Sequence, residues 1–106
     1  MHVRTSLVVV VAAAAVAVSA GGAAGLAGNP CGTISTAGHT WVVAAHGVSC
    51  SGAKKLIRSL AAKPLPRGPV GAYDGTFLGM RCVHLPAGAG FIACGSTNKG
   101  VQAAAR

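Results

Sequence analysis

Hydrophobic residues follow different patterns along the chain, and two of these patterns predict regular elements of a folded domain. Residues 40–45 are apolar and partly β-branched between Gly38 and Gly47, which is typical of a short buried strand. Residues 50–62 carry apolar side chains at helical spacing directly after Ser49, a preferred helix N-cap residue. We therefore expect an amphipathic helix whose inner face consists of Ala53, Leu56, Ile57, Leu60 and Ala61.

The chain after this helix predicts a proline-rich connection followed by a hairpin. Residues 63–69 contain three prolines and should end the helix, because proline has no N–H and clashes with the preceding turn. Apolar residues 76–84 and 90–94 then flank a turn rich in Pro and Gly, which is typical of a β-hairpin. A turn centred in this segment places Cys82 opposite Cys94.

Together these elements predict a small α+β domain over residues 39–96. We expect one amphipathic helix packed on a small, mainly antiparallel three-stranded sheet. Residues 21–38 are rich in small and turn-forming residues and are expected to form a flexible N-terminal segment. Residues 97–106 are expected to form a frayed C-terminal tail.

The first 20 residues have the pattern of a secretory signal peptide. A short cationic start is followed by an uncharged apolar run at residues 7–18 and by small residues. Cleavage is expected after Ala20, with Ala24 and Ala27 as alternative sites. An uncleaved membrane anchor is the alternative, but a span needs about 20 apolar residues and this run is shorter. The sequence therefore predicts a secreted or envelope-associated protein.

Export changes the expected chemistry of the four cysteines, Cys31, Cys50, Cys82 and Cys94. An even number in an oxidising compartment predicts two disulfides, and three pairings exist. Zinc is disfavoured, because no two cysteines have the close spacing of a structural zinc site. We favour Cys50–Cys94 with Cys31–Cys82, since Cys50 faces the core and long loops gain most from closure. This gain from closure does not decide whether Cys50 bonds to Cys94 or to Cys82, and a direct cross-strand Cys82–Cys94 bond is a further alternative.

The charge balance points to an anionic partner. Nine Lys and Arg residues oppose one acid, Asp74, which gives a formal net charge of +8. Cell-wall polymers and phospholipid surfaces are the expected partners, whereas sequence-specific nucleic-acid binding is not expected because stacking aromatics are missing. We expect a monomer. The cationic candidates lie on one helix face and in the following turn: Lys54, Lys55, Arg58, Lys63 and Arg67.

Catalytic chemistry has few candidates in this sequence. A single acid excludes hydrolysis by paired carboxylates, and Asp74 lies in a Tyr-Asp-Gly turn. The candidates for metal binding are His39, His46 and His84, but the first two flank the first strand at opposite ends and cannot share an ion. We expect no metal, no cofactor and no enzymatic activity. The alternative functions are a cationic antimicrobial or toxin-like effector and, third, a small secreted enzyme.

The central part of the chain also resembles a family of small exported actinobacterial proteins of unknown function. The similarity rests on residues 42–56, with their Gly-Val-Ser-Cys turn, and on two cysteine-containing segments at residues 79–82 and 91–94. The resemblance implies export and a strand–helix–hairpin fold. It implies no activity. Cys31 lies outside the matching part.

Overall fold

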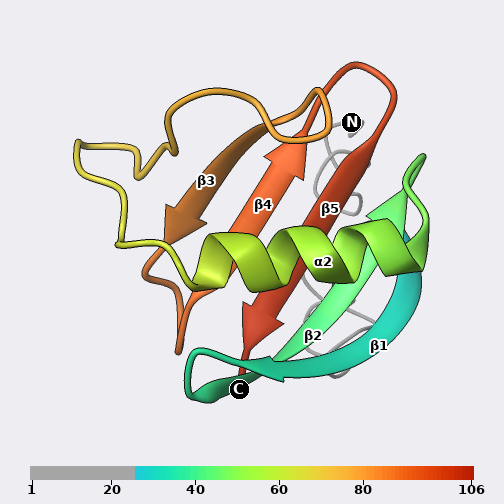
Figure 1. Cartoon of the computed structure of the whole chain (residues 1–106), viewed down its shortest axis with the longest axis horizontal. Helices are drawn as coiled ribbons and strands as arrows, with labels where there is room; N and C mark the ends of the chain where they lie inside the picture. Colours follow the sequence, from blue (N-terminus) through green and yellow to red (C-terminus); the bar gives the residue numbers. More distant parts are fainter. Residues whose placement is uncertain (1–25) are drawn as a thin grey trace, which may run out of the picture.

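One helix lies across one face of an antiparallel sheet in the computed structural model, which describes residues 26–106 (Figure 1). The sheet has five strands in the order β1-β2-β5-β4-β3. The predicted signal peptide, residues 1–20, and the alternative cleavage site at Ala24 lie outside the described residues. The elements are β1 (Asn29–Thr36), β2 (His39–His46), α2 (Cys50–Ala61), β3 (Arg81–Leu85), β4 (Phe91–Gly95) and β5 (Gly100–Ala105).

The helix begins and ends close to its predicted bounds. The Ser49 hydroxyl accepts a hydrogen bond from the Gly52 N–H at 3.0 Å, which satisfies one of the free donors of the first turn. Ala53, Leu56, Ile57 and Leu60 are buried against the sheet, as their spacing predicts. Ala61, at the end of the stripe, is only partly buried. The hydrophobic core therefore lies between the helix and the inner face of the sheet.

The α+β class is confirmed, but the predicted three-stranded sheet is wrong. The hairpin of β3 and β4 forms with Cys82 paired to Cys94, as expected, but its first strand begins at Arg81 and not at residue 76. Two further strands lie where irregular chain was expected, β1 within residues 21–38 and β5 within residues 97–106. The folded domain thus extends beyond the predicted bounds of 39–96.

Strand β1 is an edge strand that escapes pattern-based prediction because its ladder is irregular. It pairs antiparallel with β2 through a two-residue turn in which Ala37 and Gly38 both have positive φ, the conformation of a tight hairpin turn. A bulge between Pro30 and Gly32 shifts the register. Only Cys31 and Ile34 in this strand are buried, so the usual alternation of apolar and polar residues is lost.

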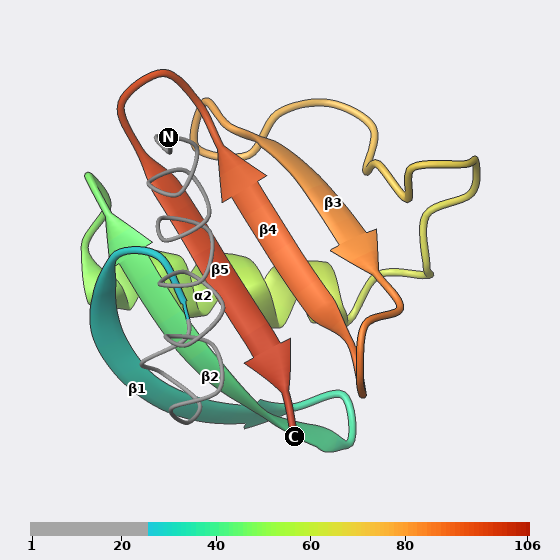
Figure 2. The ribbon, with the colours of Figure 1, turned by 180° about the vertical axis from the view of Figure 1, so that it is seen from behind.

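Strand β5 is the central strand of the sheet, although it is the last element of the chain. It pairs with β2 on one side and with β4 on the other. Val101 and Ala103 are fully buried on the inner face, in the same cluster as the helix residues. Seen from behind, β5 separates the β1–β2 pair from the β3–β4 pair (Figure 2). The sheet is therefore continuous only because of the C-terminal residues.

All four cysteines form disulfides, but the favoured pairing is wrong. Cys31 is bonded to Cys50 and Cys82 to Cys94. Strand β1, which was not predicted, brings Cys31 beside the start of α2, with a Cα–Cα distance of 5.3 Å to Cys50. Cys82 and Cys94 are directly opposite each other in the hairpin register. Each bond thus links neighbouring elements instead of closing a long loop.

The two disulfides are expected to differ in their rate of reduction. Cys50 is exposed at the first residue of α2, whereas Cys82 and Cys94 are 1% and 5% exposed. Because a thiolate must reach a sulfur atom to exchange with it, mild dithiothreitol should open Cys31–Cys50 first. Timed alkylation followed by peptide mass spectrometry measures the order. In strong denaturant, where both bonds are accessible, the difference should disappear. Earlier alkylation of Cys82 and Cys94 in the native protein would contradict the expected order of reduction.

Within residues 26–106, no helix is long and apolar enough to cross a membrane.

Candidate functional site

The five predicted cationic residues do not form one continuous surface in the structure. Lys54, Lys55 and Arg58 lie on the side of α2 opposite its buried stripe, and we call these three residues the cationic face. Lys55 and Arg58 are exposed, and Lys54 is half-buried, leaning across β1 so that a Cβ on Gly32 would lie 3.9 Å from its Nζ. Arg58 also lies in the last turn of α2, where a cation complements the helix dipole.

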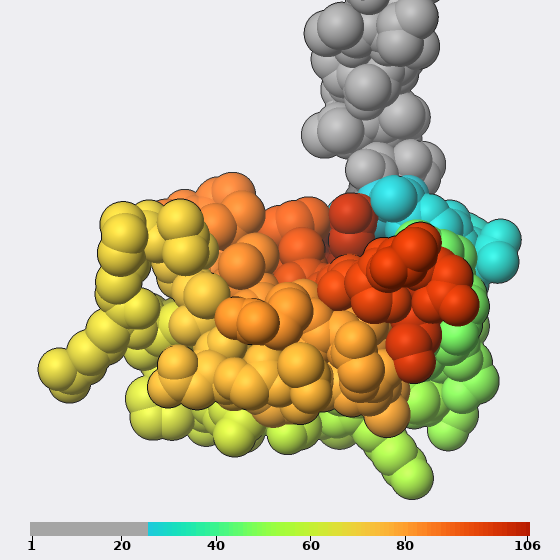
Figure 3. Space-filling model, turned by 90° about the horizontal axis from the view of Figure 1, so that it is seen from above, coloured from blue at the N-terminus to red at the C-terminus, as the bar shows by residue number. Residues whose placement is uncertain are grey.

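Lys63 and Arg67 lie beyond the helix and belong to a different part of the surface. The Lys63 ammonium lies 5.9 Å from the centre of the Phe77 ring, a cation–π geometry that holds this side chain over Phe77. Arg67 is exposed in the loop after α2, which projects from the body of the protein in the space-filling view (Figure 3). The structure therefore brings three of the five predicted residues together on one helix face.

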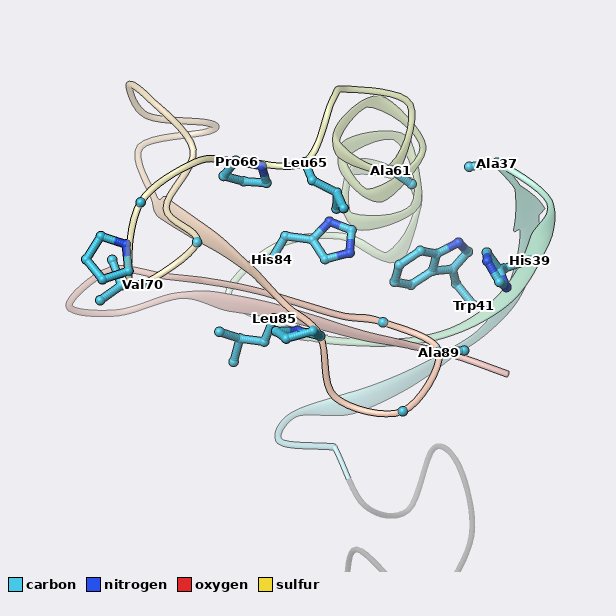
Figure 4. A pocket seen from close by; sticks show the side chains of 16 residues that line it. Ala37, His39, Trp41, Ala61, Leu65, Pro66, Val70, His84, Leu85 and Ala89 are labelled. Carbon is cyan, nitrogen blue, oxygen red and sulfur yellow. The ribbon is translucent and has the colours of Figure 1, made fainter.

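A cleft of about 620 Å³ opens between this projecting loop and the turn that joins β3 to β4 (Figure 4). Its walls come from three separate stretches of chain, residues 37–41, 61–71 and 84–90. His39, Trp41 and His84 supply its aromatic side chains. Its rim carries Leu65 and Val70, which are 69% and 63% exposed. We call this feature the cleft.

The loop side of the cleft is fixed by backbone pairing with β3. The His84 N–H donates to the Gly71 carbonyl at 2.8 Å, and the Tyr73 N–H donates to the Cys82 carbonyl at 3.0 Å. Gly71 has a φ of +64°, and a Cβ at this position would clash with the carbonyl oxygen of His84. Only glycine therefore allows the loop to approach β3 this closely.

The imidazole of His84 is held in one orientation and one tautomer. The buried Tyr73 hydroxyl lies 3.0 Å from the Leu60 carbonyl oxygen and 2.8 Å from His84 Nδ1. A carbonyl can only accept, so the single hydroxyl proton of Tyr73 is donated to Leu60. The Tyr73 oxygen must then accept from Nδ1–H of His84, which leaves Nε2 as the nitrogen with a free lone pair.

The free nitrogen of His84 faces the interior of the cleft. A Cβ on Gly90, which also lines the cleft, would lie 3.4 Å from His84 Nε2 and 3.4 Å from the Trp41 ring. Among residues 26–106, Nε2 of His84 has no hydrogen-bond partner, and it is not sealed from solvent. Burial lowers the pKa of His84, so the ring stays neutral in more acidic solution.

The remaining aromatic groups line the cleft in edge-to-face contact. The Trp41 ring centre is 5.9 Å from that of His84 and 6.4 Å from that of His39, with interplanar angles of 79° and 82°. The indole N–H donates to the Thr36 carbonyl at 3.3 Å, so Trp41 has no donor left for a ligand. Trp41 is 2% exposed and forms the base of the cleft. Chemically, the site offers one hydrogen-bond acceptor in a fixed orientation, Nε2 of His84, among apolar and aromatic side chains.

The other predicted residues fall outside this site. His46 lies at the opposite end of β2 from His39, as expected, and packs beside Gly100. Asp74 lies in an exposed bend. No group of three metal-ligating side chains occurs in the described part of the chain. His84 and Trp41 were not predicted to share a site, because no local pattern connects the three segments that build the cleft. In the sequence, only the apolar residues of the proline-rich loop indicate the cleft.

No protein-family profile, curated protein or solved structure matches this chain. The resemblance to small exported actinobacterial proteins therefore stays a prediction.

Proposed function

We propose that the protein is an exported, non-enzymatic module whose cationic face binds anionic polymers of the cell envelope or the extracellular space. The observation that carries this proposal is the placement of Lys55 and Arg58 on the exposed side of α2, with the half-buried Lys54 beside them toward β1. The side chains are presented by an element that is anchored on its other side in the core. A preorganised row of cations loses less conformational entropy on binding than cations on a mobile segment.

The charge balance supports binding to a partner outside the chain. Nine Lys and Arg residues face one acidic side chain in the whole sequence, so most of the cations have no carboxylate partner within the protein. The resulting positive field attracts polyanions and raises their association rate at low ionic strength. The same field weakens in concentrated salt, because the Debye length shrinks to about 3 Å at 1 M.

The buried stripe of α2 favours a soluble polymer over a membrane. A helix that inserts into a lipid surface must offer its apolar side to the acyl chains. In α2 that side consists of Ala53, Leu56, Ile57 and Leu60, all of which are buried in the domain core. Contact with a linear chain of phosphodiesters or carboxylates needs only the opposite side.

The proposal is tested by titration with a glycerol-phosphate polymer, the type of chain found in anionic cell-wall polymers. The helix triple variant Lys54→Ala, Lys55→Ala, Arg58→Ala removes the cationic face and keeps helix propensity high. We expect it to lose about tenfold in affinity at low salt, since each exposed ion pair contributes roughly 0.2–1 kcal/mol. Calorimetry at several salt concentrations measures the loss and the slope of log affinity against log salt, which should become shallower.

A matched variant separates the cationic face from net charge alone. Arg81→Ala, Lys99→Ala, Arg106→Ala removes the same three charges from positions outside α2 and should change the affinity by less than about threefold. Equal losses in the two triple variants would overturn the assignment to the helix. Absence of wild-type binding at low salt, or binding to phosphatidylglycerol vesicles with dye leakage and none to the polymer, would overturn the proposed function.

A further inference from the structure

We infer that the cleft is a binding site for a small neutral phenol, whose hydroxyl donates a hydrogen bond to Nε2 of His84. This site does not depend on the proposed function, because it shares no side chain with the cationic face. Its opening lies between the loop at residues 65–71 and the turn at residues 85–90, as seen in Figure 4.

The size and character of the cleft define the first property of its ligand. Its volume of about 620 Å³ falls in the range of small-molecule pockets, roughly 300–1,000 Å³. Among the described residues, four large hydrophobic side chains are conspicuously exposed, and three of these, Leu65, Val70 and Leu85, line the cleft. Apolar side chains that converge on one concavity while exposed to water mark a binding site better than scattered ones. The ligand should therefore be mainly apolar.

The electrostatics of the lining define the second property, neutrality. The cleft is lined by no Lys, Arg, Asp or Glu among residues 26–106, although the protein as a whole is strongly cationic. An ionised ligand would lose its hydration on entering and find no ammonium, guanidinium or carboxylate group in return, since His39 and His84 are the only ionisable side chains that line the cleft among the described residues. Burial also lowers the pKa of His84, which favours the neutral form of its imidazole. A neutral molecule is the class that the cleft can take up.

The tautomer of His84 defines the third property, a donor group. The Tyr73 oxygen accepts the hydrogen bond of the Nδ1–H group, so the nitrogen that faces the cleft can only accept. Trp41 has its N–H bonded to Thr36 and is not free to donate. The edge-to-face contacts among Trp41, His84 and His39 line the cleft with ring edges and faces, against which a planar ring can pack. A phenol combines the planar ring with the donor that this nitrogen requires.

The test uses 2-naphthol as the probe and 2-methoxynaphthalene as its matched control. The two compounds have the same ring system, but the methyl ether cannot donate a hydrogen bond. We expect saturable binding of 2-naphthol, about three- to tenfold tighter than that of the ether, which is the effect of one hydrogen bond. Amide chemical-shift changes should cluster at Trp41, Val70 and His84. The ¹⁵N resonance of unprotonated His84 Nε2 should move with 2-naphthol only.

Two variants locate the acceptor. His84→Phe should reduce 2-naphthol affinity to that of the ether, whereas His46→Phe, the same change at the far end of β2, should leave it within twofold. Equal binding of the two compounds to the unaltered protein would overturn the proposal, and so would shift changes outside the cleft or no saturable binding. Because the comparison of the two compounds uses the unaltered chain, it stays decisive even if His84→Phe fails to fold.

Discussion

A chain that ends at Asn98 is expected not to fold under conditions in which the full chain is stable. The deletion removes β5, which hydrogen-bonds to β2 along one edge and to β4 along the other. It also removes Val101 and Ala103, both fully buried beneath the helix layer. The β1–β2 pair and the β3–β4 pair would then be left with no strand between them, and isolated hairpins are at best marginally stable.

The measurement is the near-ultraviolet circular dichroism of the chain together with its urea unfolding curve. The truncated chain should show no cooperative transition, although both disulfides can still form. Deletion of Arg106 alone is the control, because this exposed residue contributes one backbone hydrogen bond, from its N–H to the Thr40 carbonyl at 2.8 Å. That deletion should cost about 1 kcal/mol or less. A sharp unfolding transition in the chain that ends at Asn98 would mean that β5 is peripheral.

The second large effect is expected from Ile57→Ala in the middle of α2. Ile57 is fully buried and faces the sheet from the centre of the helix. Truncation to alanine leaves a cavity and should lower the free energy of unfolding by about 2–5 kcal/mol. A domain of this size has roughly 4–12 kcal/mol in total, so the variant should be close to unfolding at moderate temperature.

Leu65→Ala provides the matched control for Ile57→Ala. Leu65 is 69% exposed. Its truncation to alanine removes a similar number of carbon atoms as Ile57→Ala does, but from the exposed surface and not from the core. Its effect on the free energy of unfolding should stay within about 0.5 kcal/mol. Urea denaturation of the two variants compares them directly. Similar losses in both would contradict the assignment of α2's inner face as the centre of the core.

Local patterns in the sequence predicted the elements whose signals lie in neighbouring residues. The helix was predictable because Ser49 caps its start and because Leu56, Ile57 and Leu60 recur at helical spacing. The β3–β4 hairpin was predictable because two apolar segments flank a Pro- and Gly-containing turn. In both cases neighbouring residues carry the pattern that identifies the element.

Elements that depend on distant partners were missed. The residues of β5, Gly-Val-Gln-Ala-Ala-Ala, have little intrinsic preference for a strand, and they adopt one because they lie between β2 and β4. The error in the disulfides follows from missing β1, since without that strand Cys31 has no fixed place beside Cys50. The cleft was missed for the same reason, because Trp41 and His84 meet only when the whole sheet has assembled.

The order of the disulfide bonds has a consequence for biosynthesis. The first cysteine pairs with the second and the third with the fourth. When the chain emerges from the ribosome or a translocon with its N-terminus first, the second cysteine appears before the third and fourth. The first cysteine therefore meets its native partner first, and the third and fourth then have only each other as free thiols. Oxidation in order of emergence then yields the native bonds directly. Such a chain should acquire its bonds without the help of a disulfide isomerase, needing only an oxidant.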